Sequence, residues 1–185
     1  MLILVVGPSG AGKDTLIDGA HAALGEHVSV RFVRRVITRP VTAGGERHES
    51  VSDDEFLRRR EDGDFALAWT AHGLQYGIPA DISVDLSDGH IVVANVSRAV
   101  VAEAAARFPV GIIEVTAPPQ VLAARLAHRG REDADDVARR LSRAIEVKPA
   151  AERIVVVNDG SVEQGVRRML DAIRTLGGEG VGPVQ

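Results

Sequence analysis

The feature that most constrains this chain is the stretch from Gly7 to Thr15, which reads Gly-Pro-Ser-Gly-Ala-Gly-Lys-Asp-Thr. An apolar run over residues 2–6 precedes it, and Leu16 and Ile17 follow it. This context predicts a strand, a glycine-rich loop and a helix, where Gly-x4-Gly-Lys is typical of a phosphate-binding loop. Glycine lets backbone N–H groups turn onto phosphate oxygens, and the helix presents its positive end to them. We therefore expect a nucleoside triphosphate site.

The loop and the start of the helix supply the expected nucleotide ligands, and Lys13 is expected to reach the terminal phosphates as a catalytic residue. One position departs from the usual pattern, because Asp14 occupies the place of the Ser or Thr that normally binds Mg²⁺. A carboxylate is also a hard oxygen ligand, so Asp14 and the adjacent Thr15 are both candidate metal ligands. The nucleotide-binding set is Gly7, Pro8, Ser9, Gly10, Ala11, Gly12, Lys13, Asp14 and Thr15.

Composition limits the other function classes. A chain of 185 residues with 45% hydrophobic and 26% charged residues fits one domain. Its net charge of −4 argues against broad binding to nucleic acid or to membrane surfaces. The absence of Cys excludes disulfides and thiolate metal sites, and no apolar run approaches the length of a membrane span. We expect a cytoplasmic protein, and the sequence leaves a homodimer open.

Strand and helix patterns alternate along most of the chain, which predicts an α/β fold: a P-loop three-layer sandwich with a central parallel sheet. Residues 38–87 lack that alternation and are interpreted as a small insertion over the carboxyl edge of the sheet. Residues 177–185, with four glycines, are expected to be a frayed tail. The expected strands of the sheet are 2–6, 28–37 (running into a loop), 91–94, 111–115 and 154–157.

Two arginine clusters lie on glycine-containing segments. The first cluster, between residues 34 and 47, is expected to bind a second phosphorylated ligand, because guanidinium groups bind phosphate bidentately. The alternative is that it forms a solvated basic face. The second, with residues 128–136 as a lid, would stabilise charge on a transferring phosphoryl group, whereas a salt-bridged surface hairpin is the alternative. The clusters are Arg34, Arg35, Arg39 and Arg47, and then Arg125, Arg129, Arg131, Arg139 and Arg140.

Four further polar residues have less specific signals. His48 and His72 could donate protons, but histidines without metal-ligand spacing are more often surface or hydrogen-bonding residues. Asn95 ends a buried strand beside the loop, where it keeps an oxygen but lacks the charge of a metal-binding carboxylate. Asn158 follows the last strand and is placed to touch adenine, unless Asn158-Asp159-Gly160 is only a turn.

These residues resemble the guanylate kinase superfamily over nearly the whole chain. The resemblance implies a core sheet, an acceptor-binding insertion, a closing lid, and ATP with Mg²⁺ as phosphoryl donor. The chain departs from the guanylate kinase pattern at two places, and both make GMP a poor candidate for the acceptor. Residues 47–51 lack a Tyr, and Ala68 stands where those enzymes have a Glu that binds guanine. The shared motifs are the loop at Gly7, Thr38-Arg39-Pro40, Gly45-Glu46, Ser52 to Phe56, Trp69, Tyr76-Gly77, Arg129-Gly130-Arg131 and Asn158-Asp159.

The chain is more similar to the ribose 1,5-bisphosphate phosphokinases of phosphonate catabolism. That resemblance implies ATP-dependent phosphorylation of a phosphorylated sugar, ribose 1,5-bisphosphate, to 5-phosphoribosyl 1-diphosphate (PRPP). It also implies that Arg39 and Tyr76 bind the acceptor phosphate, that His72 and Arg98 lie nearby in roles it does not specify, and that Arg129 and Arg131 contact the transferring phosphoryl group. Arg47 and Asn95 complete the expected substrate-binding set. The shared motifs are residues 12–14, 36–40, 44–48 and 65–79, Asn95-x-Ser97-Arg98 and residues 129–132.

Two other functions stay open at this point. One is a nucleoside monophosphate kinase with relaxed choice of base, since a site lacking buried polar partners discriminates weakly. The other is a non-catalytic binding module that resembles guanylate kinase. Such modules usually lose the phosphate loop or its Lys, and both are intact here.

Overall fold

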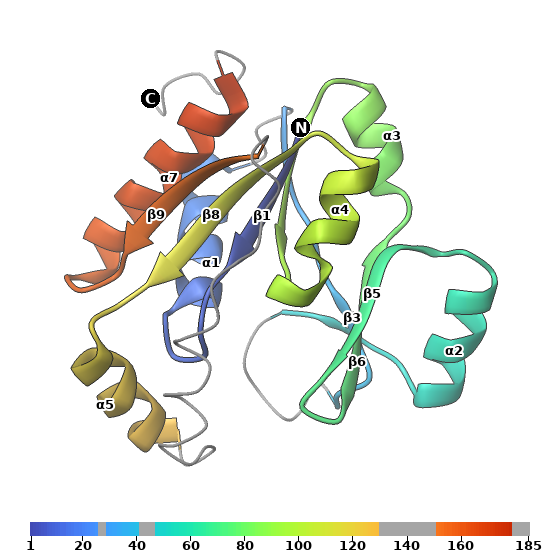
Figure 1. Cartoon of the computed structure of the whole chain (residues 1–185), viewed down its shortest axis with the longest axis horizontal. Coiled ribbons are helices and arrows are strands. Elements are labelled where there is room, and N and C mark those ends of the chain that lie inside the picture. Colours follow the sequence, from blue (N-terminus) through green and yellow to red (C-terminus); the bar gives the residue numbers. More distant parts are fainter. Residues whose placement is uncertain (26–28, 41–46, 130–150, 179–185) are drawn as a thin grey trace.

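The computed structural model describes residues 1–25, 29–40, 47–129 and 151–178. Its centre is a five-stranded sheet in the order β2-β7-β1-β8-β9, and every neighbouring pair is parallel (Figure 1). The predicted α/β fold with a central parallel sheet is therefore confirmed. The strands are β1 (Leu2–Val6), β2 (Val30–Phe32), β7 (Ile91–Asn95), β8 (Val110–Thr116) and β9 (Glu152–Val157).

Both faces of this sheet are covered, because successive residues of a strand point to opposite faces and all five residues of β1 are buried apolar residues. Ile3 and Val5 belong to a core shared with α1 (Lys13–Leu24) and α7 (Val162–Gly177). The alternate residues of β1 belong to a second core, shared with α3 (Ile82–Ser87) and α4 (Val101–Arg107). These helices form the outer layers of the predicted three-layer sandwich (Figure 1).

A second, four-stranded sheet in the order β4-β3-β6-β5 lies beside the first (Figure 1). Its strands are β3 (Val36–Ile37), β4 (Glu49–Ser50), β5 (Phe65–Ala71) and β6 (Leu74–Pro79). Helix α2 (Asp53–Glu61) lies between β4 and β5 in the chain and begins at Ser52, whose hydroxyl accepts the Glu55 N–H at 3.2 Å. Ile37, Trp69 and Tyr76 of this sheet join the second core.

The single strand expected over residues 28–37 is wrong, because the chain forms two strands there. β2 pairs with β7 in the large sheet, whereas β3 pairs with β4 and β6 in the small one. Arg34 and Arg35 lie between them, one exposed and the other half-buried. Two guanidinium groups would lose their hydration inside a sheet that is covered on both faces, so the strand cannot continue through them.

The C-terminal helix begins with a capping box, in which the Ser161 hydroxyl accepts from the Gln164 N–H and the Gln164 side chain accepts from the Ser161 N–H. Ser97 caps the short 3-10 helix η2 (Arg98–Val100), and α4 begins only afterwards. Helix α5 (Pro119–Arg129) follows β8. The predicted lid (128–136) lies outside the described residues from 130 onward, and the predicted tail (177–185) from 179 onward; Gly177 is the last residue of α7. In the described part of the chain, no helix is long and apolar enough to cross a membrane.

Candidate active site

The glycine-rich loop follows β1 at the point where the chain order in the sheet reverses, between β7 and β8. In open α/β sheets, ligands bind in the crevice at this position. At two positions of the loop the backbone conformation and the close neighbours leave room only for glycine. Gly7 has a φ of 149° and a Cβ there would collide with the Val115 carbonyl, while Gly12 has a φ of 88° and a Cβ would collide with the Asn158 amide. The strand–loop–helix predicted from the sequence is thus present.

Side chains from two distant parts of the chain hold the loop. Lys13 Nζ donates to the carbonyl oxygens of Gly7 at 2.9 Å and Pro8 at 3.1 Å. The buried Asn158 donates its Nδ2 to the Ala11 carbonyl at 2.8 Å. Asn158 thus contacts the loop and does not line the cavity described next, and its expected contact with adenine stays a prediction. Its role in the geometry is to fix the loop.

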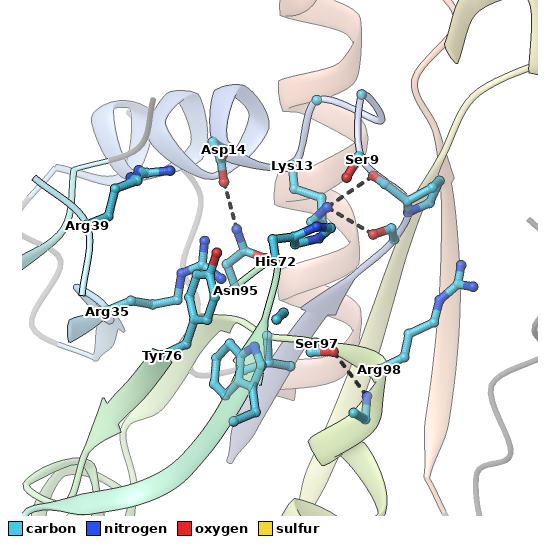
Figure 2. A pocket seen from close by; sticks show the side chains of 18 of the residues that line it. Ser9, Lys13, Asp14, Arg35, Arg39, His72, Tyr76, Asn95, Ser97 and Arg98 are labelled. Carbon is cyan, nitrogen blue, oxygen red and sulfur yellow. Dashed lines mark hydrogen bonds between the residues drawn. The ribbon is translucent and has the colours of Figure 1, made fainter. Parts of the chain in front are cut away.

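A cavity of 690 Å³ opens beside the loop (Figure 2). Side chains from the loop, the β5–β6 hairpin and the end of β7 surround it, and Figure 2 shows them gathered around one space. Its volume is within the range of small-molecule sites, about 300–1,000 Å³. The predicted site residues that line it are Gly7, Pro8, Ser9, Gly10, Gly12, Lys13, Asp14, Thr15, Arg39, His72, Tyr76, Asn95 and Arg98.

Asp14 and Asn95 meet at the wall of this cavity. Asn95 Nδ2 donates to Asp14 Oδ1 at 2.6 Å, so the end of β7 is tied to the first turn of α1 (Figure 2). Asn95 is 8% exposed, and its Oδ1 has no hydrogen-bond partner among the described residues. A buried oxygen in that state favours a donor, such as a water or hydroxyl group, in the adjoining space.

The β5–β6 hairpin brings two aromatic side chains, Trp69 and Tyr76, and His72 to the cavity. The Trp69 and Tyr76 rings stack at 5.4 Å, and the Arg35 guanidinium lies over the Tyr76 ring at 5.2 Å. His72 and Gly73 form the two-residue turn with φ values of 53° and 71°. Positive φ at both positions is typical of a type I′ turn, where a non-glycine residue such as His72 is uncommon.

Arg39 is held by a buried histidine. His48 is 4% exposed, and its two ring nitrogens lie 2.9 Å from the Arg39 carbonyl oxygen and 3.3 Å from an Arg39 guanidinium nitrogen. Arg34 donates to the His48 carbonyl at 2.8 Å. The sequence placed His48 among surface or hydrogen-bonding residues, and the structure assigns it the second of these roles.

Arg98 is paired with a buried carboxylate that no sequence motif indicated. Glu114, on β8, is 9% exposed and accepts from Arg98 at 2.9 Å through one oxygen and from Arg153 through the other. The three residues come from η2, β8 and β9. Only the register of the sheet brings them together, so no local pattern could have predicted the network.

A second cavity, of 210 Å³, adjoins the first at Asp14 and Asn95, which line both. Arg47 lines this second cavity and not the first. Asp18 also lies here, and burial, together with the neighbouring Asp14 carboxylate, raises its pKa. The full lining is Asp14, Ile17, Asp18, His21, Phe32, Val33, Arg34, Arg47 and Asn95.

The positions of the predicted lid side chains, Arg129 and Arg131, lie outside what the structure describes. Arg131 is not among the described residues, and Arg129 is the last residue of α5. Another arginine of α5 does reach the loop, since Arg125 lies 3.5 Å from the Gly10 carbonyl oxygen. Arg125 belongs to the second arginine cluster. Its place on a helix that begins at Pro119 was therefore the sequence signal for a role beside the loop. The cavity-lining residues outside the predicted site set are Arg35, Trp69, Ala71, Val96, Ser97 and Ala99.

Comparison with protein families places residues 2–147 in the AAA domain family. The chain is 55% identical over 162 residues to the ribose 1,5-bisphosphate phosphokinase PhnN of Acidiphilium cryptum, covering 88% of this chain and 86% of that protein. It is 52% identical over 174 residues to the bifunctional ribose 1,5-bisphosphokinase-thymidine phosphorylase of Cupriavidus necator. That match covers 92% of this chain but only 28% of the relative, so this chain spans less than a third of the bifunctional protein.

Among solved structures, the guanylate kinase of Anaplasma phagocytophilum has a TM-score of 0.70 at 18% identity, covering 95% of this chain and 85% of that one. An unliganded sugar kinase from a Janibacter species has a TM-score of 0.52, also at 18% identity, covering 93% of each chain. At these identities the likeness concerns the fold alone. It agrees with the guanylate kinase-like architecture that the motifs predict.

Proposed function

This chain belongs to the family of ribose 1,5-bisphosphate phosphokinases, and we propose that it transfers a phosphoryl group from ATP to ribose 1,5-bisphosphate, giving PRPP and ADP. One observation carries the proposal most directly. A phosphate-binding loop with an intact Lys13 faces Arg39 and Tyr76 across a single cavity of 690 Å³. Phosphoryl transfer depends mainly on positioning and charge neutralisation, and the cavity offers both.

The donor side is formed by the loop. Its backbone N–H groups and the start of α1 would bind the phosphates, with the loop kept in shape by Asn158. The Lys13 ammonium, which now donates to two loop carbonyls, is within the same turn and would donate to phosphate oxygens instead. That exchange keeps the ammonium hydrogen-bonded in both states, so nucleotide binding does not leave it buried and unsatisfied.

The residues beside the loop fit a bound Mg²⁺. Asp14 presents a carboxylate, and the buried Asn95 oxygen would accept from a water of the hydrated ion. The described residues contain no group of three or more His, Asp or Glu placed to hold a metal. That agrees with Mg²⁺, which usually binds through one or two carboxylates plus substrate phosphates and waters. When bound, the ion would neutralise charge on the phosphates during transfer.

The acceptor side is rich in guanidinium groups. Arg39 is fixed by His48, and Arg35 lies against Tyr76, so both present charge from constrained positions. Bidentate guanidinium–phosphate pairing gives strong and oriented binding. No general base is needed, because the attacking phosphate oxygen of the acceptor is already ionised at pH 7. The chain's own residues therefore bind, align and neutralise, without moving a proton.

The small sheet is poorly suited to a nucleobase. Ala68 on β5 offers no hydrogen-bond acceptor from its side chain, and the Trp69 and Tyr76 rings already stack on each other. None of these three side chains offers a carboxylate to the polar edge of a guanine base, and a site without that partner binds the base less selectively. A sugar phosphate makes no such demand, and this favours it over GMP.

The test is an acceptor profile. Purified protein is incubated with ATP and Mg²⁺ and with ribose 1,5-bisphosphate, GMP or dGMP, and ADP release is followed while ³¹P NMR identifies the product. We expect turnover with ribose 1,5-bisphosphate and a diphosphate at the anomeric position of the product. Clear preference for GMP would instead establish the nucleoside monophosphate kinase, and absence of ATP binding by calorimetry would favour the non-catalytic module.

Lys13→Ala serves as the matched inactive variant. We expect it to lose at least about two orders of magnitude in turnover, because a preorganised charge on the transferring group is removed. Its circular dichroism spectrum and unfolding midpoint should stay close to those of the parent protein. Full activity in this variant would refute the assignment of the loop as the donor site.

A further inference from the structure

The second cavity has a composition that the donor site does not account for. Helix α1 contributes Asp14, Asp18 and His21 to it, and these positions, with Ile17, lie on one face of the helix. Arg34 and Arg47 face them from the segments after β2 and before β4. Carboxylates and guanidinium groups thus line one small space.

That mixture selects for one kind of ligand. A bare phosphate would meet Asp18 as well as the arginines, and a purely cationic ligand would meet the arginines as well as Asp18. A ligand with both hydroxyl groups and a phosphate satisfies both, because carboxylates accept from hydroxyls and guanidinium groups donate to phosphate. Sugar phosphates have this chemistry.

The position of the cavity agrees with that ligand class. Asp14 and Asn95 line both cavities and are hydrogen-bonded at 2.6 Å, so the pair forms a common wall. A ligand that reacts beside the loop and extends past this wall would enter the second cavity with its far end. At 210 Å³ the space is smaller than a typical whole-ligand site, which suits one end of a ligand.

We propose that the second cavity is the subsite for the non-reacting end of the acceptor, in which Arg47 and Arg34 bind its distal phosphate and Asp18 accepts from a ring hydroxyl. This inference rests on the proposed function, since it assigns the 5-phosphate of ribose 1,5-bisphosphate to a place separate from the reacting anomeric phosphate. The subsite makes the enzyme specific for a sugar carrying two phosphates.

The decisive experiment compares two acceptors that differ only at the far end: ribose 1,5-bisphosphate and ribose 1-phosphate. Arg47→Gln should reduce the preference for the bisphosphate, expressed as the ratio of the two kcat/KM values, by roughly tenfold to a hundredfold, since a charged hydrogen bond to phosphate is lost. The KM for ATP should not change. Arg34 is a less clean target, because it also donates to the His48 carbonyl beside Arg39.

Two further variants separate the roles. Asp18→Asn keeps the size of the side chain and should raise the KM for both ribose acceptors by a similar factor, leaving their ratio intact, because both carry the ring hydroxyls. Arg60→Gln removes an exposed arginine from α2, away from both cavities, and should change neither ratio nor KM. An unchanged ratio in Arg47→Gln, with the parent protein active on the bisphosphate, overturns the subsite.

A binding measurement keeps this outcome distinct from failure of the proposed function. Ribose 5-phosphate carries the distal phosphate and the hydroxyls but no anomeric phosphate, so it cannot react as the acceptor. Calorimetry should find weaker binding of it to Arg47→Gln than to the parent protein or to Arg60→Gln. Equal affinity in all three, or no binding to the parent protein at about 10 mM, overturns the subsite even if no acceptor is turned over.

Discussion

Asn158 offers a sharp test of how the phosphate-binding loop is held. The residue is 6% exposed and donates Nδ2 to the Ala11 carbonyl at 2.8 Å. Asn158→Asp preserves size but, when ionised, offers only acceptors at that position. A carboxylate oxygen would then face the carbonyl oxygen. Leaving the buried carbonyl without a donor costs about 1–3 kcal/mol, and burying the new charge adds to this.

The effect should depend on pH in a defined direction. When the new carboxyl of Asn158→Asp is protonated it can donate to Ala11, so burial and this hydrogen bond would raise its pKa in the folded state above about 3.9. A group with a raised folded pKa stabilises below its unfolded pKa and loses that contribution as the pH rises. The variant should therefore be close to the parent protein near pH 4 and at least about 1 kcal/mol less stable at pH 7.5.

Urea unfolding at both pH values gives the stability difference, and ATP titration gives the effect on the loop. We expect the KM for ATP to rise at pH 7.5, because the Ala11–Gly12 peptide is no longer fixed. Asp159→Asn is the matched control, since Asp159 pairs with Arg168 at 2.7 Å on the surface, where solvent screens the pair and its loss should change little. Equal stability and equal KM in Asn158→Asp and the parent protein at pH 7.5 would refute the reasoning.

Two further predictions concern charges around the cavities. Asp18→Asn should slightly stabilise the free protein at neutral pH, because partial burial and the neighbouring Asp14 carboxylate raise the pKa of Asp18. The gain should be well under about 1 kcal/mol, since most of the side chain is exposed and solvent screens its charge. It should vanish below about pH 3.8, and thermal melts at pH 3.5 and 7.5 measure it. Glu114→Gln should cost about 1–3 kcal/mol, since the partly exposed Arg98 and Arg153 lose their charge-assisted hydrogen bonds to the shared carboxylate. Glu103→Gln, which breaks only the exposed pair with Arg107, should cost about 1 kcal/mol or less in the same urea titration, and equal losses in the two variants would show that Glu114 has no special role.

The parts of the fold that the sequence predicts correctly have strong local signals. The loop at Gly7 combines fixed glycine spacing with an apolar strand, and both are visible within one short segment. The strand β1 and the first four residues of β7 are continuous apolar runs, and β8 is mostly apolar around Glu114, because the sheet is covered on both faces. The capping box at Ser161 also has a local signature, since it depends only on residues three positions apart.

The parts that the sequence did not predict depend on contacts far apart in the chain. β3 and β4 have two residues each, too few for any period to appear. Glu114 meets Arg98 and Arg153 only because η2 follows β7 and because β8 and β9 are neighbours. The position of Asn158 after β9 was predicted correctly, but no local pattern indicates that its amide turns toward the Ala11 carbonyl of the loop.

The contacts of His48 with Arg39 affect the entropy of ligand binding. A free arginine side chain loses about 2 kcal/mol of rotational freedom when it is immobilised. Here both the guanidinium and the backbone carbonyl of Arg39 are already fastened to one imidazole before any ligand arrives. Most of that entropic loss is therefore incurred during folding, and an anion that reaches Arg39 meets a receptor already set in place, so its capture should be less opposed by entropy.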